Sequence, residues 1–450
     1  MEDKLRKLNV EVTTNCNLEC AMCMRRVWNE ESGDMSLETF KALVPAFAQI
    51  ETINIIGIGE PLLNENIFEM ISLGRKNLPA QGTISMTTNA TLIDQSIAEK
   101  IVTSGLTDLV ISLDGACAET YNRIRSGADF YTVLSKLNLV NTVKEDFKSS
   151  IPRIGLEFVA MKDNVAELPQ LVDLAAQNNV AFIIVSNILP HTVEMNEQVL
   201  YDKNSDKAIE LFNEAKKEAS NRSLKIEFDT PDVENYANAL FGRPPIKDKL
   251  RTGHTKYEDI PGYNEGMRKK LQLLDEVVAN ARQQNVLMSF KDLIPRNDEF
   301  IHNVEKIFDD ARVRAAKHGI SLNLPPLIPR TDRECGFIKE GISFISWDGY
   351  VRPCNNLYHS YMCYVNSREK SITKWDFGNV LQRDFIDIWN SREYRSFRKK
   401  VLKFDFAPCG DCPHSEGCFA LRYPVFRMDC YEYTLPCGDC PWARGILQCM

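Results

Sequence analysis

Three cysteines near the start of the chain have the spacing of a metal-binding loop. Cys16, Cys20 and Cys23 form the pattern C-x3-C-x2-C. Cysteine thiolates hold iron–sulfur clusters, usually four for a cubane, and three thiolates leave one iron open to a small molecule. Zinc is the alternative metal, but no histidine or fourth cysteine lies nearby to complete a tetrahedron. The spacing therefore favours an iron–sulfur cluster with one open position.

A second and larger group of cysteines lies at the C-terminal end. Of the 14 cysteines in 450 residues, none lies between positions 118 and 334 and ten lie beyond them. We exclude Cys363 as a ligand, which leaves nine candidates: Cys335, Cys354, Cys409, Cys412, Cys418, Cys430, Cys437, Cys440 and Cys449. Two C-x2-C pairs among them are also typical of a zinc module, although such a module would leave five cysteines unused. We therefore expect a segment that folds around metal.

The composition restricts the partners and the cellular compartment that we expect for this protein. A net charge of −8 and a pI near 5.5 argue against nucleic-acid or anionic-membrane partners. No apolar run approaches the roughly 18 residues of a membrane span, and the first residues lack the apolar core of a signal peptide. We expect a cytoplasmic protein, in which clustered cysteines serve metal binding or catalysis rather than disulfides.

Short apolar runs alternate with amphipathic runs over the first part of the chain. We predict six strands with helices between them, at residues 8–13, 52–58, 83–88, 109–113, 154–159 and 181–185. One helix is expected over 36–50 with Ser36 as its N-cap, and a long helical stretch precedes residue 147. Repeated strand–helix units predict a parallel sheet with helices outside, which we interpret as an open, partial (βα)6 TIM-like barrel.

The remaining chain breaks this rhythm. Helices are predicted at 206–219, 264–283 and 300–318, and irregular, cysteine-rich structure follows from residue 335. We therefore expect an α/β protein with a partial barrel over 1–190, a helical insertion or cover over 191–330, and an iron–sulfur domain over 331–450.

The cysteine triad after the first strand of such a barrel resembles the radical S-adenosylmethionine (radical SAM) superfamily. Gly59-Glu60-Pro61 is similar to that family's GGE motif, with Ile58 in place of the first glycine. The resemblance implies that the cofactor is contacted by Gly59, Glu60, Pro61, Thr88, Asn89, Ser112, Asp114 and Arg125. Arg125 would pair with the cofactor carboxylate, with Arg123 as a competitor. These positions all follow strand ends, where parallel βα folds place their sites.

The C-terminal cysteines closely resemble the SPASM domain, an extension of radical SAM enzymes that holds two auxiliary 4Fe–4S clusters. Leu421 and Arg422 stand where that family usually has its next cysteine. From the resemblance we assign Cys409, Cys412 and Cys418 to an outer cluster with Cys437 or Cys440. We assign Cys335 and Cys354 to an inner cluster with Cys430 and, as a further candidate, Cys449.

The resemblance also implies a reaction. The cluster on the triad would reductively cleave S-adenosylmethionine, and the resulting 5′-deoxyadenosyl radical would abstract hydrogen from a peptide, protein or cofactor substrate. A reductant such as flavodoxin or ferredoxin would supply the electron. No catalytic side chain is assigned, because this chemistry belongs to the cofactor.

The substrate is narrowed by two local similarities. The tail from Cys437 to Cys449 and the segment Tyr358-His359-Ser360 resemble a subgroup of metalloenzyme maturases, associated with tungsten-containing aldehyde oxidoreductases. The first alternative is an enzyme that forms a thioether or carbon–carbon crosslink in a ribosomal peptide. An N-terminal peptide-binding domain, common in such enzymes, is not expected here. The alternative of another class is a non-catalytic iron–sulfur electron carrier or a zinc-binding protein.

Overall fold

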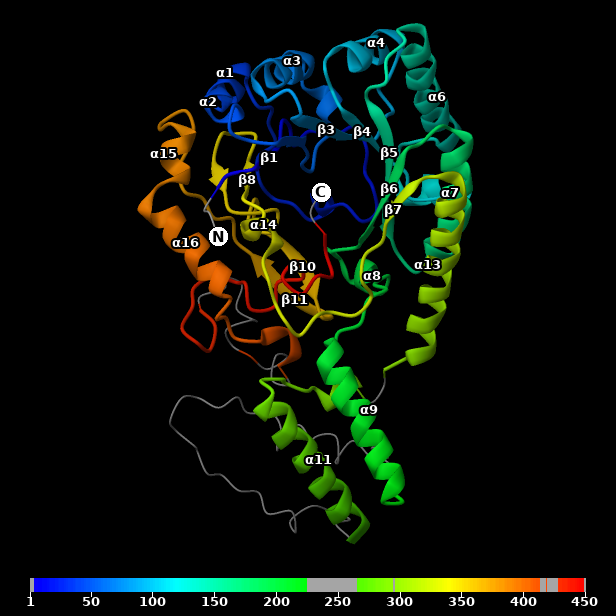
Figure 1. The fold of residues 1–450 in the computed structure, drawn as a ribbon, viewed down its shortest axis with the longest axis vertical. Coiled ribbons are helices and arrows are strands. Elements are labelled where there is room, and N and C mark those ends of the chain that lie inside the picture. The colour runs from blue at the N-terminus through cyan, green and yellow to red at the C-terminus, as the bar shows by residue number, and fades with distance from the viewer. Residues whose placement is uncertain (1–3, 225–264, 294–295, 413–417, 419–427, 449–450) are drawn as a thin grey trace.

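A nine-stranded sheet organises the fold of the computed structural model, which describes residues 4–224, 265–293, 296–412, 418 and 428–448 (Figure 1). Its order is β7-β6-β5-β4-β3-β2-β1-β8-β9. The strands are β1 (Lys7–Val10), β2 (Thr52–Ile55), β3 (Thr83–Thr88), β4 (Asp108–Ser112), β5 (Arg153–Ala160), β6 (Phe182–Asn187), β7 (Ser321–Asn323), β8 (Ile342–Ile345) and β9 (Val351–Arg352).

Strands β1 to β6 are parallel neighbours in chain order, which confirms the predicted partial barrel. The sheet continues beyond them, because β7 pairs in parallel with β6 and β8 pairs in parallel with β1. Thus β7 and β8, which come from the expected insertion and the cysteine-rich segment, extend the barrel sheet. The division into three domains at 190 and 330 stays a prediction.

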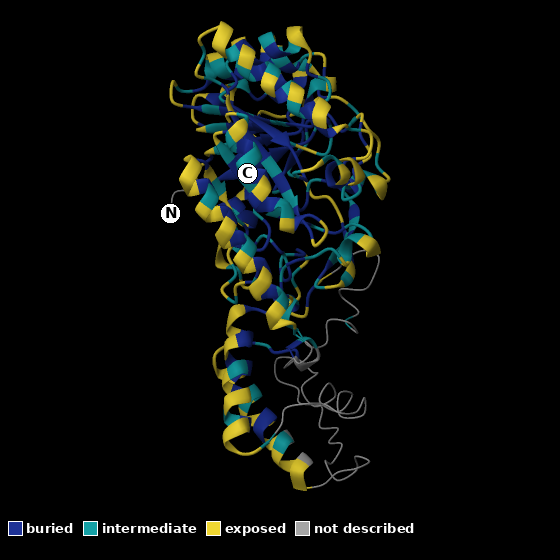
Figure 2. Cartoon of the chain, turned by 90° about the vertical axis from the view of Figure 1, so that its right-hand side faces the viewer, coloured by how far each residue is buried: buried dark blue, intermediate teal, exposed yellow. Residues whose placement is uncertain are grey.

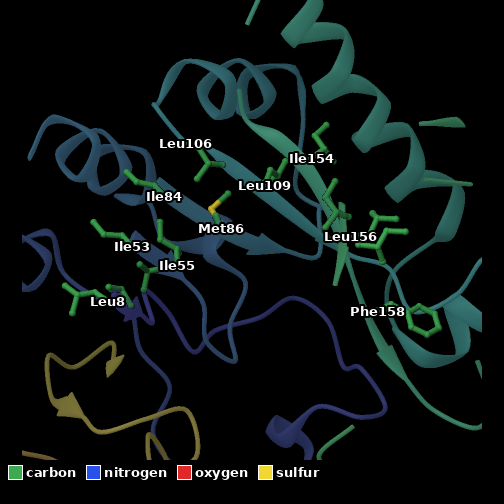
Figure 3. Packing of buried hydrophobic residues seen from close by; sticks show 14 of the residues in the cluster. Leu8, Ile53, Ile55, Ile84, Met86, Leu106, Leu109, Ile154, Leu156 and Phe158 are labelled. Atoms are coloured by element: carbon green, nitrogen blue, oxygen red, sulfur yellow. The ribbon is translucent and has the colours of Figure 1, made fainter. Parts of the chain in front are cut away.

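Helices cover the outer face of the sheet. They are α1 (Leu37–Lys41), α2 (Val44–Phe47), α3 (Ile67–Asn77), α4 (Gln95–Thr103), α5 (Ala118–Ile124), α6 (Phe130–Asp146), α7 (Leu168–Gln177) and α13 (Asp298–His318), with single turns η2 (Pro61–Leu63) and η3 (Val165–Glu167). Alternate strand residues such as Leu8, Ile53, Met86 and Leu156 point from the strands into the layer beneath these helices (Figure 3). The opposite side of each strand therefore faces the barrel interior.

Two of the predicted helices are each divided in the structure. The helix expected over 36–50 begins as predicted, because Ser36 Oγ accepts a hydrogen bond from the Thr39 amide at 3.0 Å. It is split into α1 and α2 where Pro45 enters the first turn of α2, since proline has no amide hydrogen to continue the ladder. The stretch before residue 147 is divided into α5 and α6, and Gly127 between them has a φ of +95°.

Helices α9 (Asp206–Asn221) and α11 (Glu265–Gln283) form a pair that projects from the rest of the molecule (Figures 1 and 2). They pack through their own apolar cluster, which includes Ile209, Phe212 and Leu274. These two helices therefore extend away from the barrel. Within the described ranges, no helix is long and apolar enough to cross a membrane.

The cysteine-rich part consists of short elements. These are α14 (Gly336–Lys339), α15 (Phe385–Trp389), α16 (Arg392–Lys403), η5 (Cys409–Asp411) and the antiparallel hairpin of β10 (Tyr361–Val365) and β11 (Arg368–Ile372). Its last segment returns to the barrel, because Asn187 at the end of β6 donates to the Ile446 carbonyl at 3.0 Å. Asn323 in β7 likewise donates to Gln448 at 2.9 Å. Residues 446–448 thus lie against the carboxyl ends of β6 and β7.

Candidate metal and cofactor centre

The loop that carries Cys16, Cys20 and Cys23 follows β1 and lies beside the segment after α5. The amides of Glu19 and Ala21 donate to the Ser126 and Ile124 carbonyls at 3.1 and 2.8 Å. Burial raises the pKa of Cys20 to about 11; the Arg125 guanidinium opposes this shift, whereas the thiols of Cys23 and Cys16 add to it. The three thiols therefore lie close enough to repel one another as thiolates, which is the arrangement that a positively charged iron centre relieves.

Gly59 brings the end of the second βα loop against the cysteine loop. A Cβ atom at this position would lie 2.3 Å from the Thr13 carbonyl oxygen and 2.7 Å from that of Asn15. The next amide, that of Glu60, donates to the Asn15 carbonyl at 2.8 Å. Only glycine permits this approach, so Gly59 joins the two loops through main-chain contact.

The Glu60 side chain ties the second strand end to the third. Its buried carboxylate accepts hydrogen bonds from Thr88 Oγ1 and the Asn89 amide, both at 2.7 Å, and from the Leu62 amide at 3.1 Å. Pro61 begins the turn η2 directly after it. In this geometry Glu60 orients the strand ends around the cysteine loop, and its contact with the cofactor stays a prediction.

Asn89 and Arg125 approach the cysteine sulfurs directly. Asn89 Nδ2 lies 3.9 Å from Cys16 Sγ, and a guanidinium nitrogen of Arg125 lies 3.9 Å from Cys20 Sγ. Arg125 Nε also donates to Asp114 Oδ2 at 2.6 Å, in a pair that is almost wholly buried. Side chains that follow β3 and β4 therefore converge on the cysteine triad.

The structure separates the two candidate arginines. Arg123 lies on the surface of α5, where it pairs with Asp163 at 2.6 Å and both side chains are about half exposed. Arg125, which follows the last residue of α5, turns inward to Asp114 and Cys20. Ser112 is buried at the end of β4. Because β2, β3 and β4 are parallel neighbours, the predicted cofactor positions that follow these strands lie at one edge of the sheet.

Glu157 is a residue of this centre that the sequence reasoning missed. It lies on β5 opposite Ser112, between Leu156 and Phe158, whose side chains belong to the core beneath the helices. Alternation along the strand therefore directs Glu157 into the barrel. Burial raises the pKa of its carboxyl group to about 7; nearby Arg125 opposes this shift and Asp114 adds to it. A charged residue inside an otherwise apolar strand was the available signal.

A buried histidine links the cysteine-rich part to the first strand. His359 contacts Glu11 Oε2 through Nε2 and Glu30 Oε2 through Nδ1, both at 2.9 Å. Burial alone would lower the pKa of His359, but the two carboxylates outweigh it and raise that pKa to about 9. The imidazolium thus joins the end of β1, the loop after the cysteine triad and the segment before β10.

Hydrogen bonds also connect the barrel interior to the second cysteine group. Ser85 Oγ donates to Asn54 at 2.9 Å, and Asn54 donates to Asn9 at 3.0 Å. Asn9 in turn donates to Asn355 at 3.3 Å. Because Asn355 follows Cys354, this polar row runs from β3 through β1 to a candidate metal ligand.

Electrostatic interactions among the C-terminal thiols suggest a second grouping beside the predicted one. Burial raises the pKa values of Cys335, Cys354, Cys437 and Cys440, and mutual repulsion of the thiolates raises those of the first three further. We call these four the inner set. The predicted pairing of Cys335 and Cys354 with Cys430 stays a prediction, and Cys449 lies outside the described residues.

Cys430 interacts with the three thiols predicted for the outer cluster, and we call Cys409, Cys412, Cys418 and Cys430 the outer set. Burial raises the pKa of Cys409, and interaction with Cys430 and Cys412 raises it further. Cys430 interacts in the same way with Cys412 and Cys418. The turn between Cys437 and Cys440 also lies beside Cys409, because a Cβ atom at Gly438 would lie 3.1 Å from Cys409 Sγ. The predicted contribution of Cys437 or Cys440 to the outer cluster therefore stays a prediction.

Two observations test whether these thiols fit iron–sulfur clusters. All described cysteines are free thiols, and each C-terminal set contains the four thiol donors that a cubane needs. Within the same described ranges, no group of three or more His, Cys, Asp or Glu side chains is placed to hold a single metal ion. A cubane puts each thiolate on a different iron, so it does not require the donors to surround one ion.

Two family models match the chain. One is the Radical SAM superfamily, over residues 10–175, and the other is SPASM, an iron-sulfur cluster-binding domain, over residues 335–413. The chain thus carries both domains. Iron–sulfur clusters and S-adenosylmethionine are the cofactors that these domains use.

Relatives and solved structures extend this result. The chain is 24% identical over 449 residues to the "tungsten-containing aldehyde ferredoxin oxidoreductase cofactor-modifying protein" of Pyrococcus furiosus, covering 99% of this chain and 97% of that protein. It is 30% identical over 183 residues to a "probable GTP 3′,8-cyclase" of Methanocaldococcus jannaschii, covering 38% and 57%. The structure of Streptococcus suis SuiB bound to precursor peptide SuiA shares the fold, with a TM-score of 0.50, 14% identity, and coverage of 97% and 76%.

Proposed function

We propose that this chain, a radical SAM enzyme with a SPASM domain, modifies a cofactor, protein or peptide during maturation of a tungsten-type metalloenzyme. The observation that carries the proposal is the convergence of Glu60, Asn89 and Arg125 on the loop of three cysteines. When bound, the cluster and S-adenosylmethionine supply reductive cleavage and a 5′-deoxyadenosyl radical that abstracts hydrogen from the substrate.

The residues of the chain have distinct parts in this proposal. Cys16, Cys20 and Cys23 hold the cluster at which the cofactor binds, and the inner and outer sets hold two auxiliary clusters. Arg125 places a positive charge beside Cys20, where it favours the thiolate and a cofactor carboxylate. Glu60 and Gly59 keep the strand ends in position through the contacts with Asn89 and Asn15.

The tungsten assignment is supported by the name of the Pyrococcus furiosus relative, since the similarity spans nearly the whole of both chains. The alternative is a ribosomal-peptide substrate, which the SuiB likeness leaves open because fold similarity at 14% identity does not identify a substrate. Mass spectrometry separates these classes: the purified enzyme is incubated with an immature tungsten oxidoreductase, and the mass change is sought in its organic cofactor and in its polypeptide.

Cofactor cleavage tests the core of the proposal. Protein reconstituted with iron and sulfide without oxygen, then reduced with dithionite, is expected to convert S-adenosylmethionine to 5′-deoxyadenosine. Replacement of Cys16, Cys20 and Cys23 by alanine should abolish this product, whereas Cys117→Ala, at an exposed cysteine outside the three sets, should retain it. A wild-type protein that cycles electrons but yields no 5′-deoxyadenosine would instead be an electron carrier.

A further inference from the structure

Helix α16 (Arg392–Lys403) presents a basic surface on an acidic molecule. Its apolar residues Tyr394, Phe397 and Val401 are buried. Its outer side carries one acid, Glu393, and five cations at least partly open to solvent, Arg392, Arg395, Lys399, Lys400 and Lys403. None of the five forms an ion pair with another residue in the described ranges. The whole chain has a net charge of −8, so the five cations make this helix a positively charged patch on an acidic protein.

A groove borders the patch. It has a volume of about 480 Å³ and is lined by aromatic and apolar residues such as Trp375, Phe377 and Leu435, by Lys400 and by two acids, Asp376 and Glu393. Trp375 is 40% exposed. Exposed aromatic residues beside a basic helix are typical of protein–protein contact surfaces rather than of an ordinary solvated helix.

The patch lies next to the outer cysteine set. Lys400 Nζ lies 3.9 Å from the centre of the Tyr433 ring, and the Tyr433 amide donates to Asp429 at 2.9 Å. Asp429 directly precedes Cys430, which is exposed. In Figure 1, α16 lies on the side of the molecule opposite α7 and α13. The basic surface thus adjoins the place where a candidate cluster ligand reaches the solvent.

We propose that α16 and its groove form the docking site for an acidic one-electron carrier protein, which reduces this chain at the outer cysteine set. The proposal rests on the proposed function, because each cleavage of S-adenosylmethionine consumes one electron. In the step itself, the reduced carrier loses one electron and the iron–sulfur protein gains one, while no bond forms or breaks. Opposite charges steer such encounters, and electron-transfer contacts are small and transient.

Comparing a protein reductant with a small-molecule reductant distinguishes a defect in docking of the carrier from a defect in cofactor cleavage. We compare the triple variant Arg395→Glu, Lys399→Glu, Lys403→Glu with wild type, using an acidic flavodoxin kept reduced by NADPH and its reductase, and separately dithionite. We expect the flavodoxin-driven rate of 5′-deoxyadenosine formation to fall about tenfold or more, and the dithionite-driven rate to stay unchanged. The wild-type flavodoxin rate should also fall as ionic strength rises.

The matched control reverses three exposed cations of α13, Lys306→Glu, Arg312→Glu and Lys317→Glu. The proposal is overturned by equal flavodoxin-driven rates in wild type and the α16 variant, by an equal loss in the control, or by a rate independent of salt. Should charge reversal impair folding, the same positions changed to glutamine carry the test. If dithionite drives no cleavage in wild type, the proposed function fails instead.

Discussion

At the scale of single residues, the difference between two neighbouring arginines shows how burial decides a role. Arg123 and Asp163 form an exposed pair, which solvent screens. Arg125 and Asp114 form an almost wholly buried pair, and Asp114 also accepts a hydrogen bond from the Val159 amide at 2.6 Å. Removing the partner of a buried carboxylate leaves a buried charge without compensation. Truncation of the two arginines should therefore change the stability of the protein by very different amounts.

We therefore expect Arg125→Ala to lower the free energy of unfolding by about 3–5 kcal/mol and to weaken S-adenosylmethionine binding. The control Arg123→Ala should change stability by less than about 1 kcal/mol. Guanidinium unfolding without oxygen measures stability, and equilibrium dialysis with labelled cofactor measures binding. Equal effects of the two substitutions would show that the pair with Asp114 is not the source of the difference.

At the scale of elements, His359 holds together segments that are distant in the chain. It contacts Glu11 after β1 and Glu30 after the cysteine loop. Although burial opposes the change, hydrogen bonds from His359 and Lys374 lower the pKa of Glu30 to about 2. Glu30 therefore stays charged over the working pH range, and the charge state of this contact depends on His359.

The sign of the pH dependence follows from the raised pKa of His359. The folded state holds the proton up to about pH 9, whereas the unfolded chain releases it near 6.5. The stabilisation is thus complete below about pH 6.5 and is lost as pH rises through 9. We expect His359→Ala to lower stability by about 3–5 kcal/mol below pH 6.5.

Denaturation midpoints at pH 6.5, 8 and 9.5 measure this effect. His359→Gln should remove most of the fall in midpoint between pH 6.5 and 9.5, because glutamine keeps polar contact without a titrating charge. His302→Gln, on the exposed face of α13, serves as the control and should keep the wild-type slope. Parallel midpoint curves for wild type and His359→Gln would contradict the assignment.

At the scale of the whole molecule, iron binding joins parts of the chain that are far apart. The inner set comprises Cys335, Cys354, Cys437 and Cys440. Asp439, which lies between Cys437 and Cys440 in the sequence, forms an ion pair with the buried Lys370 on β11. The same lysine interacts with Cys409 of the outer set. One buried cation therefore interacts with thiols of both sets.

Paired cysteine substitutions test the two sets. Wild type should bind about twelve irons per chain if three cubanes fill. Cys409→Ser with Cys430→Ser should remove about four, because both lie in one set, whereas Cys409→Ser with Cys437→Ser should remove about eight. Iron analysis and electron paramagnetic resonance count the clusters. The opposite result would instead support the predicted cluster of Cys409, Cys412 and Cys418 with Cys437 or Cys440.

Much of the fold was predictable because its signals are local. Strand polarity, Ser36 at a helix start and the spacing of the first three cysteines each extend over only a few residues. The division of the helix at Pro45 carried such a local signal too, yet helical periodicity on both sides concealed it. The extension of the sheet by β8 depends instead on pairing with β1, more than 300 residues earlier in the chain, and no local pattern specifies that pairing.

The sequence by itself determined the presence of a cysteine loop after the first strand, the barrel that supports it and the metal-binding nature of the C-terminal segment. Only the tertiary structure decided that Arg125 rather than Arg123 turns inward, that Glu157 faces the barrel interior, and that β8 extends the sheet beside β1. The reason is physical: spacing restricts residues within one loop, whereas the entropic cost of closing a loop rises only slowly with its length. Distant cysteines are therefore free to pair in several ways until packing selects one.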